Sequence, residues 1–173
     1  PQQREQLLWG LMQSAHNDKA AKQRLWELHD NDSTLRDDLL KGFLDYGDPR
    51  AKQVLGEALR TGQVSDASAN HLGYLDTALL REHASTLKAM ASNPQGSLQA
   101  RVGAYYALTQ VDQPAATDAL LNGFAGLSEE DRVNVLREVA RTTDAATRQR
   151  LRQLAEGDPS PKVKEAAKKF ANP

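Results

Sequence analysis

Histidine and glutamate side chains are the first candidates for chemistry in this chain, because they bind zinc and iron in proteins. A zinc peptidase or a di-iron hydroxylase needs a histidine followed directly by a glutamate on a helix. The four histidines are His16, His29, His71 and His83, and none of them is followed by glutamate. We therefore expect them at the surface or at helix caps, with no metal and no cofactor bound.

An acidic cluster at 30–32 and 37–38 has the residue types of a calcium-binding loop. The EF-hand pattern requires glycine at its sixth position and glutamate at its twelfth. This chain has Leu35 and Lys41 there. Helix capping by one of the residues 32–34 is the better explanation, because short polar side chains accept hydrogen bonds from the first N–H groups of a helix.

Catalytic motifs of other classes are absent from the sequence. The chain has no cysteine, no glycine-rich phosphate loop and no Gly-x-Ser-x-Gly turn, which excludes disulfides and thiolate chemistry. The paired carboxylates Glu129 and Glu130 fall in the first turn of an expected helix, where the helix dipole favours negative charge. We predict that the protein is not an enzyme. Glycines inside the expected helices should allow close helix approach: Gly42, Gly56, Gly73, Gly103 and Gly123.

Composition and charge favour a soluble helical protein. Charged residues make up 26% of the chain, apolar residues 39% and aromatics 5%, and isoleucine is absent, so strands have few of their preferred residues. Residues 1–130 hold 12 basic and 17 acidic side chains, and residues 131–173 hold 10 and 6. A basic surplus of this size is small for a nucleic-acid-binding protein.

The apolar runs, the first residue and the lack of cysteine set further expectations. No apolar run reaches the roughly 18 residues of a membrane span. The start at Pro1 suggests a processed product or part of a larger chain. The lack of cysteine is compatible with the cytoplasm or the bacterial periplasm.

A short pattern repeats along the chain. A basic residue is followed by apolar residues three and then six or seven positions later, and these offsets share one helical face. The copies begin about 16 residues apart, which predicts about eleven helices of roughly 12 residues in a single domain, 1–173. The eight copies are Arg4/Leu7/Leu11, Lys22/Leu25/Leu28, Arg36/Leu39/Phe43, Lys52/Leu55/Leu59, Arg101/Ala104/Leu108, Arg132/Val135/Val139, Arg148/Leu151/Ala155 and Lys164/Ala167/Phe170.

Several helices lack the basic residue. Residues 68–90 should hold two of them, and a third has Ala116, Leu120 and Phe124 on its apolar face. The least regular stretch is 62–76.

Capping residues support these boundaries. Asp48, Asn93 and Asp158 each precede a proline, and a proline is well tolerated at the first helical position. Ser128 with Asp131 resembles a capping box, and Asp144 is a further expected cap. Glycines are expected to end the preceding helices: Gly47, Gly62 and Gly157. The short connections then make neighbouring helices antiparallel.

Two stretches resemble the second helix of HEAT repeats, which opens with Asp-Pro, continues to Val-Arg and then becomes rich in alanine. Residues 158–167 read Asp-Pro-Ser-Pro-Lys-Val-Lys-Glu-Ala-Ala, with lysine where the family prefers arginine. Residues 93–108 form a looser copy with two additional residues before Arg101. The resemblance implies an all-α, right-handed α-solenoid of antiparallel helix pairs, related to the PBS lyase-type and armadillo-like repeats. It also implies a ladder of acidic and basic residues, with Asp48/Lys52 and Asp158/Lys164 as rungs.

A candidate binding row follows from this arrangement. The fifth position after each basic residue points away from the expected buried face. Every second helix, counted back from the one at 159–172, belongs to one set that includes the helices near 132, 101, 36 and 4. In a HEAT solenoid this set lines the concave surface. Exposed aromatic and arginine side chains are typical of binding hot spots, although Trp9 could instead cap the first helix pair and Tyr106 could pack on a neighbour. The expected binding residues are Trp9, Lys41, Tyr106, Arg137, Arg141 and Lys169.

The sequence thus predicts a non-catalytic scaffold that binds a protein or peptide. Three alternatives stay open. HEAT-like folds also occur in DNA glycosylases and phycobilin lyases, but the acidic first 130 residues do not favour a nucleic-acid groove. Residues 58–64, Ala-Leu-Arg-Thr-Gly-Gln-Val, resemble segments of the helical domain of M1-family aminopeptidases, which would make the chain an accessory domain without a metal site.

Overall fold

The computed structural model describes residues 2–141 and 145–171, without the side chains of residues 2–5, 147, 148, 151, 152, 155 and 171. The described residues form twelve α-helices and two short 3-10 helices, with no strand among them. This confirms the all-α prediction, and the helix number is close to the expected eleven. In chain order the elements are α1 (Gln2–Ala15), α2 (Lys19–Asn31), α3 (Arg36–Asp45), α4 (Pro49–Thr61), α5 (Asp66–Ala69), η1 (Leu72–Tyr74), α6 (Thr77–Glu82), α7 (Ala84–Ser92), α8 (Leu98–Thr109), α9 (Gln113–Leu121), η2 (Phe124–Gly126), α10 (Glu129–Ala140), α11 (Ala145–Gly157) and α12 (Pro161–Ala171).

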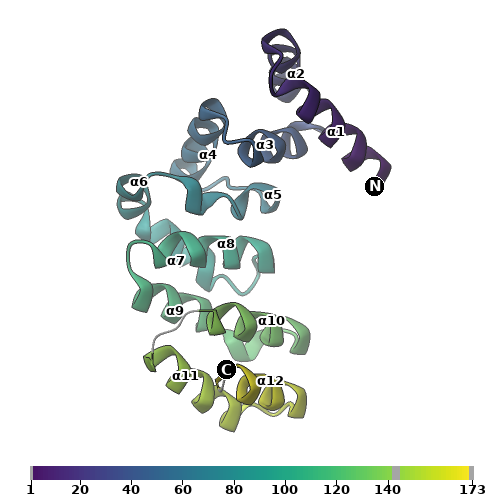
Figure 1. The fold of residues 1–173 in the computed structure, drawn as a ribbon. Coiled ribbons are helices and arrows are strands. Elements are labelled where there is room, and N and C mark those ends of the chain that lie inside the picture. Colours follow the sequence, from purple (N-terminus) through teal and green to yellow (C-terminus); the bar gives the residue numbers. More distant parts are fainter. Residues whose placement is uncertain (1, 142–144, 172–173) are drawn as a thin grey trace.

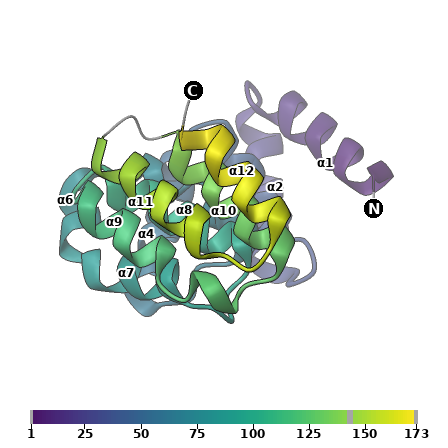
Figure 2. The ribbon, with the colours of Figure 1, turned by 90° about the horizontal axis from the view of Figure 1, so that it is seen from below.

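The helices follow one another along the molecule in chain order, from α1 and α2 at one end to α11 and α12 at the other (Figure 1). One row is continuous: α1 contacts α3, α3 contacts α5, α5 contacts α8, α8 contacts α10, and α10 contacts α12. We call these six helices the α1–α12 row. The row contains all five helices that were expected to carry the binding residues. In both views α1 projects to one side of the other helices (Figures 1 and 2).

The repeating apolar positions form the core in the middle of the chain. The predicted pairs on α3, α4, α8 and α10 are all buried, and Leu39, Leu55, Leu59 and Leu108 are completely inaccessible. The 3.6-residue period therefore identified the inner face of these helices correctly. In the copy that begins at Arg148, Leu151 and Ala155 lie outside the described side chains, as does Arg4 in the first copy.

The predicted inner face of α1 is wrong. Leu7 is 69% exposed and Leu11 is 53% exposed, whereas Met12 is 5% and Ala15 is 2% exposed. The reason is the packing of α1 against α3: a Cβ added to Gly42 of α3 would lie 3.1 Å from Met12 Cγ. The two helices approach closely there, so the face that carries Met12 turns inward.

The α2 prediction is wrong at its last position. Leu28 is 44% exposed, and Trp26 is buried in its place. The Trp26 ring stacks parallel to Phe43 of α3, with 4.0 Å between the ring centroids. An indole buries more apolar area than a leucine side chain, so the inner face rotates toward it.

Paired truncations on α1 test which face is buried. We expect Met12→Ala to destabilise the protein by about 2 kcal/mol or more, because it removes buried methylene and thioether atoms and leaves a cavity. We expect Leu11→Ala to change the free energy of unfolding by less than about 0.5 kcal/mol, as for exposed sites. Urea denaturation measures both values. A larger loss for Leu11→Ala than for Met12→Ala would restore the face predicted from the sequence.

Some predicted caps are confirmed. Asp48 precedes Pro49 at the start of α4, and its carboxylate accepts from the N–H groups of Arg50 at 2.9 Å and Ala51 at 3.3 Å. Ser128 caps α10 by accepting from the N–H of Asp131 at 3.1 Å. Three expected stop glycines lie where helices end: Gly47, Gly62 and Gly157.

Two other caps are displaced by a serine. The Asn93 side chain accepts from the N–H of Gln95 within a turn, and α8 begins later with Ser97 as its cap. Asp158 accepts from the N–H of Ser160, and Ser160 in turn accepts from the N–H of Val163 at the start of α12. Each serine is the last capping residue before its helix, and this explains the two additional residues before Arg101. The expected cap Asp144 lies outside the described residues.

Two further predictions are wrong: the helix cap among residues 32–34 and the position of Gly123 inside a helix. Asp32 accepts from the N–H of Thr34 at 2.8 Å in the turn between α2 and α3, and α3 has no side-chain cap. Gly123 is not inside a helix but has a φ of +70° in the turn before η2. The other four expected glycines all lie at close approaches to another segment, with an added Cβ 3.1 Å or less from its nearest atom: Gly42, Gly56, Gly73 and Gly103.

The repeating basic residues link helices in a different way from the predicted ladder. Lys22 of α2 pairs with Asp48 at 3.6 Å, and Arg132 of α10 pairs with Asp158 at 3.1 Å. Each aspartate precedes a helix, α4 or α12, and is joined to the helix two places earlier in the chain. Arg101 instead donates to the carbonyls of Ala91 and Leu120 at 3.1 and 2.9 Å. The ladder expected from the HEAT resemblance paired other residues: Asp48 with Lys52 and Asp158 with Lys164.

Candidate functional site

A groove between α1 and α3 brings two of the six expected binding residues together. Trp9 of α1 and Lys41 of α3 both line it, and its volume is about 370 Å³. This lies within the range of ligand-binding pockets. The other lining residues are Gln6, Leu8, Met12, Asp38, Gly42, Asp45 and Tyr46.

Most of the side chains that line the groove on α1 are apolar, and two aspartates of α3, Asp38 and Asp45, line it as well. Leu8 and Tyr46 are half-buried and pack against the core, Met12 is buried, and Trp9 is 61% exposed. Trp9 is therefore a large aromatic side chain that the rest of the chain leaves mostly open to solvent. Aromatic side chains of this kind are enriched in binding hot spots.

Asp45, which lines the groove, is held in place by a histidine. Its Oδ1 lies 2.8 Å from Nε2 of His71, whose side chain is 7% exposed and which follows α5 in the chain. The contact connects α3 to the turn between α5 and η1. The carboxylate of Asp45 is thus held at the groove although its side chain is 53% exposed.

Tyr106 was expected to face solvent, and the structure shows that it does not do so freely. It is half-buried, and its hydroxyl donates to Glu138 Oε2 at 2.5 Å across the contact between α8 and α10. Arg141 Nη1 donates to the same hydroxyl at 3.2 Å and pairs with Glu138 at 2.9 Å. Burial, together with the Glu138 hydrogen bond, raises the pKa of Tyr106 above its usual value. The five-residue offset failed here because the neighbouring α10 covers this position.

Arg137 and Lys169 are exposed, and the structure does not bring them to Trp9 and Lys41. Arg137 donates to Asn134 at 3.1 Å on its own helix, and Lys169 lies on α12 at the far end of the row. The six expected residues therefore divide into the groove residues Trp9 and Lys41, the linked pair Tyr106 and Arg141, and two separate cations. Basic side chains concentrate on α12, which has four lysines and one glutamate, whereas α10 has four acidic and two basic residues.

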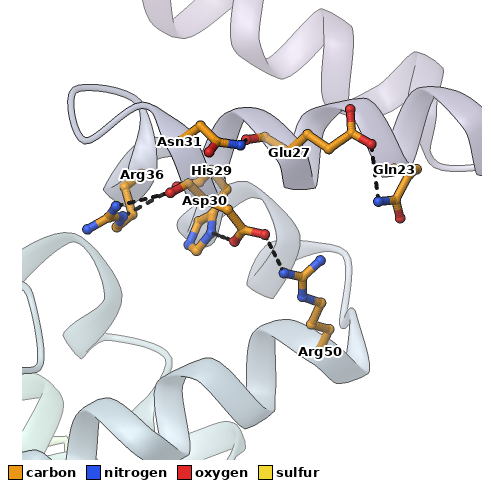
Figure 3. A network of polar contacts seen from close by, with 7 residues as sticks. All are labelled: Gln23, Glu27, His29, Asp30, Asn31, Arg36 and Arg50. Atoms are coloured by element: carbon orange, nitrogen blue, oxygen red, sulfur yellow. Dashed lines mark hydrogen bonds and ion pairs between the residues drawn. The ribbon is translucent and has the colours of Figure 1, made fainter.

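The acidic cluster in the sequence has a structural role. Figure 3 shows Asp30 at the centre of a network, with Oδ1 2.9 Å from His29 Nδ1 and Oδ2 accepting from Arg50 Nη2 at 2.7 Å. These two contacts hold the pKa of Asp30 below its ordinary value. The Arg50 guanidinium also lies 4.2 Å above the Trp26 ring. Within residues 2–141 and 145–171 no group of histidine and acidic side chains is arranged to hold a metal ion.

Sequence reasoning missed the two aspartates that line the groove and the exposed leucines of α1 and α2. Asp38 and Asp45 were considered only as part of an acidic run or not at all, yet both line the groove. Their separation of seven residues on one helix, with Lys41 between them, is the signal that could have placed them on one side. Leu7, Leu11 and Leu28 were assigned to the core and are exposed.

Comparisons with known proteins give no family for this chain. No family model, no curated protein and no solved structure matches it. None of the described helices is both long and apolar enough to cross a membrane.

Proposed function

We propose that this chain is a HEAT-like, right-handed solenoid of helix pairs that binds a protein or peptide without catalysing a reaction. The α1–α12 row is the proposed binding surface, and its ends differ in charge. The observation that carries the proposal is the groove of about 370 Å³ between α1 and α3, with the 61%-exposed indole of Trp9 beside Lys41. A ready-formed groove with an exposed aromatic wall is typical of a surface that buries a partner side chain.

A selection of random peptides displayed on phage tests this proposal with the full chain as bait. We expect peptides that bind the wild-type chain and lose roughly 10-fold or more in affinity against Trp9→Ala, as for a hot-spot aromatic residue. Tyr74→Ala is a matched control, because Tyr74 is also a largely exposed aromatic residue, at 63%, and lies outside the groove on η1. Fluorescence polarisation of the synthetic peptides gives the affinities.

Either of two results would contradict the proposal. One is a selection that returns no peptide above background. The other is a set of peptides that lose equal affinity with Tyr74→Ala and with Trp9→Ala, since that shows non-specific adhesion to exposed aromatics.

Nucleic-acid binding is the second candidate, and the exposed cations Arg137, Arg141 and Lys169 near one end favour it. Labelled duplex DNA should then be retained at low salt and released as salt rises, because phosphate contacts release counterions. Absence of any shift at about 50 mM salt excludes this candidate at useful affinity.

A further inference from the structure

We propose that two copies of this chain associate through the side of α1 that carries Leu7 and Leu11, so that the two α1 helices pack against each other across a two-fold axis. This inference goes beyond the proposed function and does not use the groove. Helical geometry places Leu7 and Leu11 about 40° apart around α1, and it places Trp9 about 160° from each of them. Trp9 lines the groove, so the proposed contact lies on the other side of the helix.

The leucines of α1 occupy positions that are buried elsewhere in the chain. Leu7 and Leu11 follow a basic residue by three and seven positions, as in the other copies of the repeated pattern. On α3, α4, α8 and α10 the residues at these offsets are buried: Leu39, Phe43, Leu55, Leu59, Ala104, Leu108, Val135 and Val139. On α1 they are 69% and 53% exposed, and Leu28 of α2 is 44% exposed. The pattern thus supplies a helix face that the described part of the chain leaves open, and a second copy would remove it from water.

The lack of charge on α1 favours a second copy over a different partner. In a two-fold contact the same patch of both copies meets, so a residue near the axis faces its own equivalent. A charged residue there would meet a like charge, which is unfavourable. Residues 6–15 read Gln-Leu-Leu-Trp-Gly-Leu-Met-Gln-Ser-Ala and contain no charged side chain, although 26% of the whole chain is charged. An axis near Gly10 therefore brings no like charges together.

Gly10 allows the two helices to approach closely. Leu7, Gly10, Leu11 and Ser14 share one side of α1, because their offsets are zero, three, four and seven. A Cβ added to Gly10 would have no atom of the described residues within 4 Å, and the Ser14 hydroxyl turns back to donate to the Gly10 carbonyl at 2.9 Å. Small residues between two leucines leave room for the side chains of a crossing helix.

The size of the contact sets the expected affinity. α1 and α2 have 14 and 13 residues, and helices of this length are about 20 Å long and about 10 Å wide. The outer side of the pair can therefore supply an interface at the lower end of the range for specific complexes, about 1,200 Å² for both copies together. α1 projects to one side of the other helices, which leaves this side accessible (Figures 1 and 2). We expect a dissociation constant between about 1 and 100 μM.

Sedimentation velocity of the full chain, from about 1 to 200 μM, measures this association. We expect a monomer–dimer equilibrium for the wild type. Leu11→Glu should weaken it by roughly 10-fold or more, because it removes apolar burial and places two carboxylates across the axis. Tyr74→Glu is the matched control and should weaken it less than about 2-fold, because Tyr74 is also largely exposed, at 63%, but lies on η1 outside the contact.

A pair of opposite charges tests whether α1 meets α1. Leu11→Lys alone should weaken association about as much as Leu11→Glu. An equimolar mixture of the two variants should associate at least about 5-fold more tightly than either variant alone, because opposite charges then face each other across the axis. A head-to-tail contact would place Leu11 against a different residue and would show no such recovery. Circular dichroism of both variants checks that they remain folded.

A wild-type chain that stays monomeric up to about 200 μM would overturn the inference and leave the leucines of α1 to a different partner. A mixture that associates no better than either variant alone would overturn it as well. Both results leave the proposed peptide groove untouched. Trp9→Ala separates the two, since it should abolish peptide binding and change self-association less than about 2-fold.

Discussion

Gly103→Ala is expected to destabilise the protein by about 3 kcal/mol, although alanine is the better helix former by about 1 kcal/mol. Gly103 lies inside α8 and faces the last residue of α5. A Cβ at this position would lie 2.3 Å from the carbonyl oxygen of Ala69 and 2.5 Å from its carbonyl carbon. These are backbone atoms, so the clash can be relieved only by moving α5 away from α8. That movement also strains the hydrogen bond from Gln110 to the Gly73 carbonyl, which is 2.8 Å long.

Two other glycines serve as controls in the same urea denaturation series. A Cβ at Gly10 would have no atom within 4 Å, so Gly10→Ala should be neutral or stabilise α1 by up to about 1 kcal/mol. At Gly56 the nearest atom is the end of the Leu79 side chain at 3.1 Å, which can rotate. We expect an intermediate loss there. A Gly103→Ala variant as stable as the wild type would show that the contact between α5 and α8 is not rigid.

The same contact explains why the stretch 62–76 was hard to predict. The sequence indicated two helices in residues 68–90, and the structure instead has α5, η1, α6 and α7 in this region. The short α5 meets α8 at a glycine 34 positions after Ala69. A local pattern of apolar residues carries no information about such a distant approach.

Helix faces were predictable where only one face is apolar. On α3 the buried residues are Leu39, Leu40, Phe43 and Leu44, and the opposite side is charged. On α1 the leucines and Met12 cover two sides, and packing against α3 decides between them. The sequence cannot make that choice, because it depends on how the two helices approach each other.

The candidate site was predictable to the same degree. Alternation of helices placed α1, α3, α8, α10 and α12 in one row, and the contacts agree. Position on a single helix identified Trp9 and Lys41 as exposed, but it could not show that they share a groove. For Tyr106 it failed, because Glu138 and Arg141 come from a neighbouring helix.

Arg101 is expected to cause the second large loss when replaced, and the expected value for Arg101→Met is about 3 kcal/mol. Its side chain is 1% exposed, and it donates to the carbonyls of Ala91 and Leu120. These carbonyls belong to the last turns of α7 and α9, where helices leave carbonyl groups without an intrahelical partner. A positive charge there also interacts favourably with both helix dipoles. Methionine can fill the space but leaves two buried acceptors without a donor.

The geometry of the guanidinium makes this a test of hydrogen bonding and not only of charge. Arg101→Lys keeps the charge, but one ammonium group cannot reproduce the two divergent N–H donors that reach separate helices, so we expect a loss of at least about half that of the methionine variant. Arg137→Met is the control, because Arg137 is exposed and should change the free energy of unfolding by less than about 0.5 kcal/mol. If Arg101→Met unfolds at the wild-type urea midpoint, the two carbonyls do not depend on this donor. The repeating arginine would then be explained by packing of its aliphatic stem and not by its role in joining the ends of two helices.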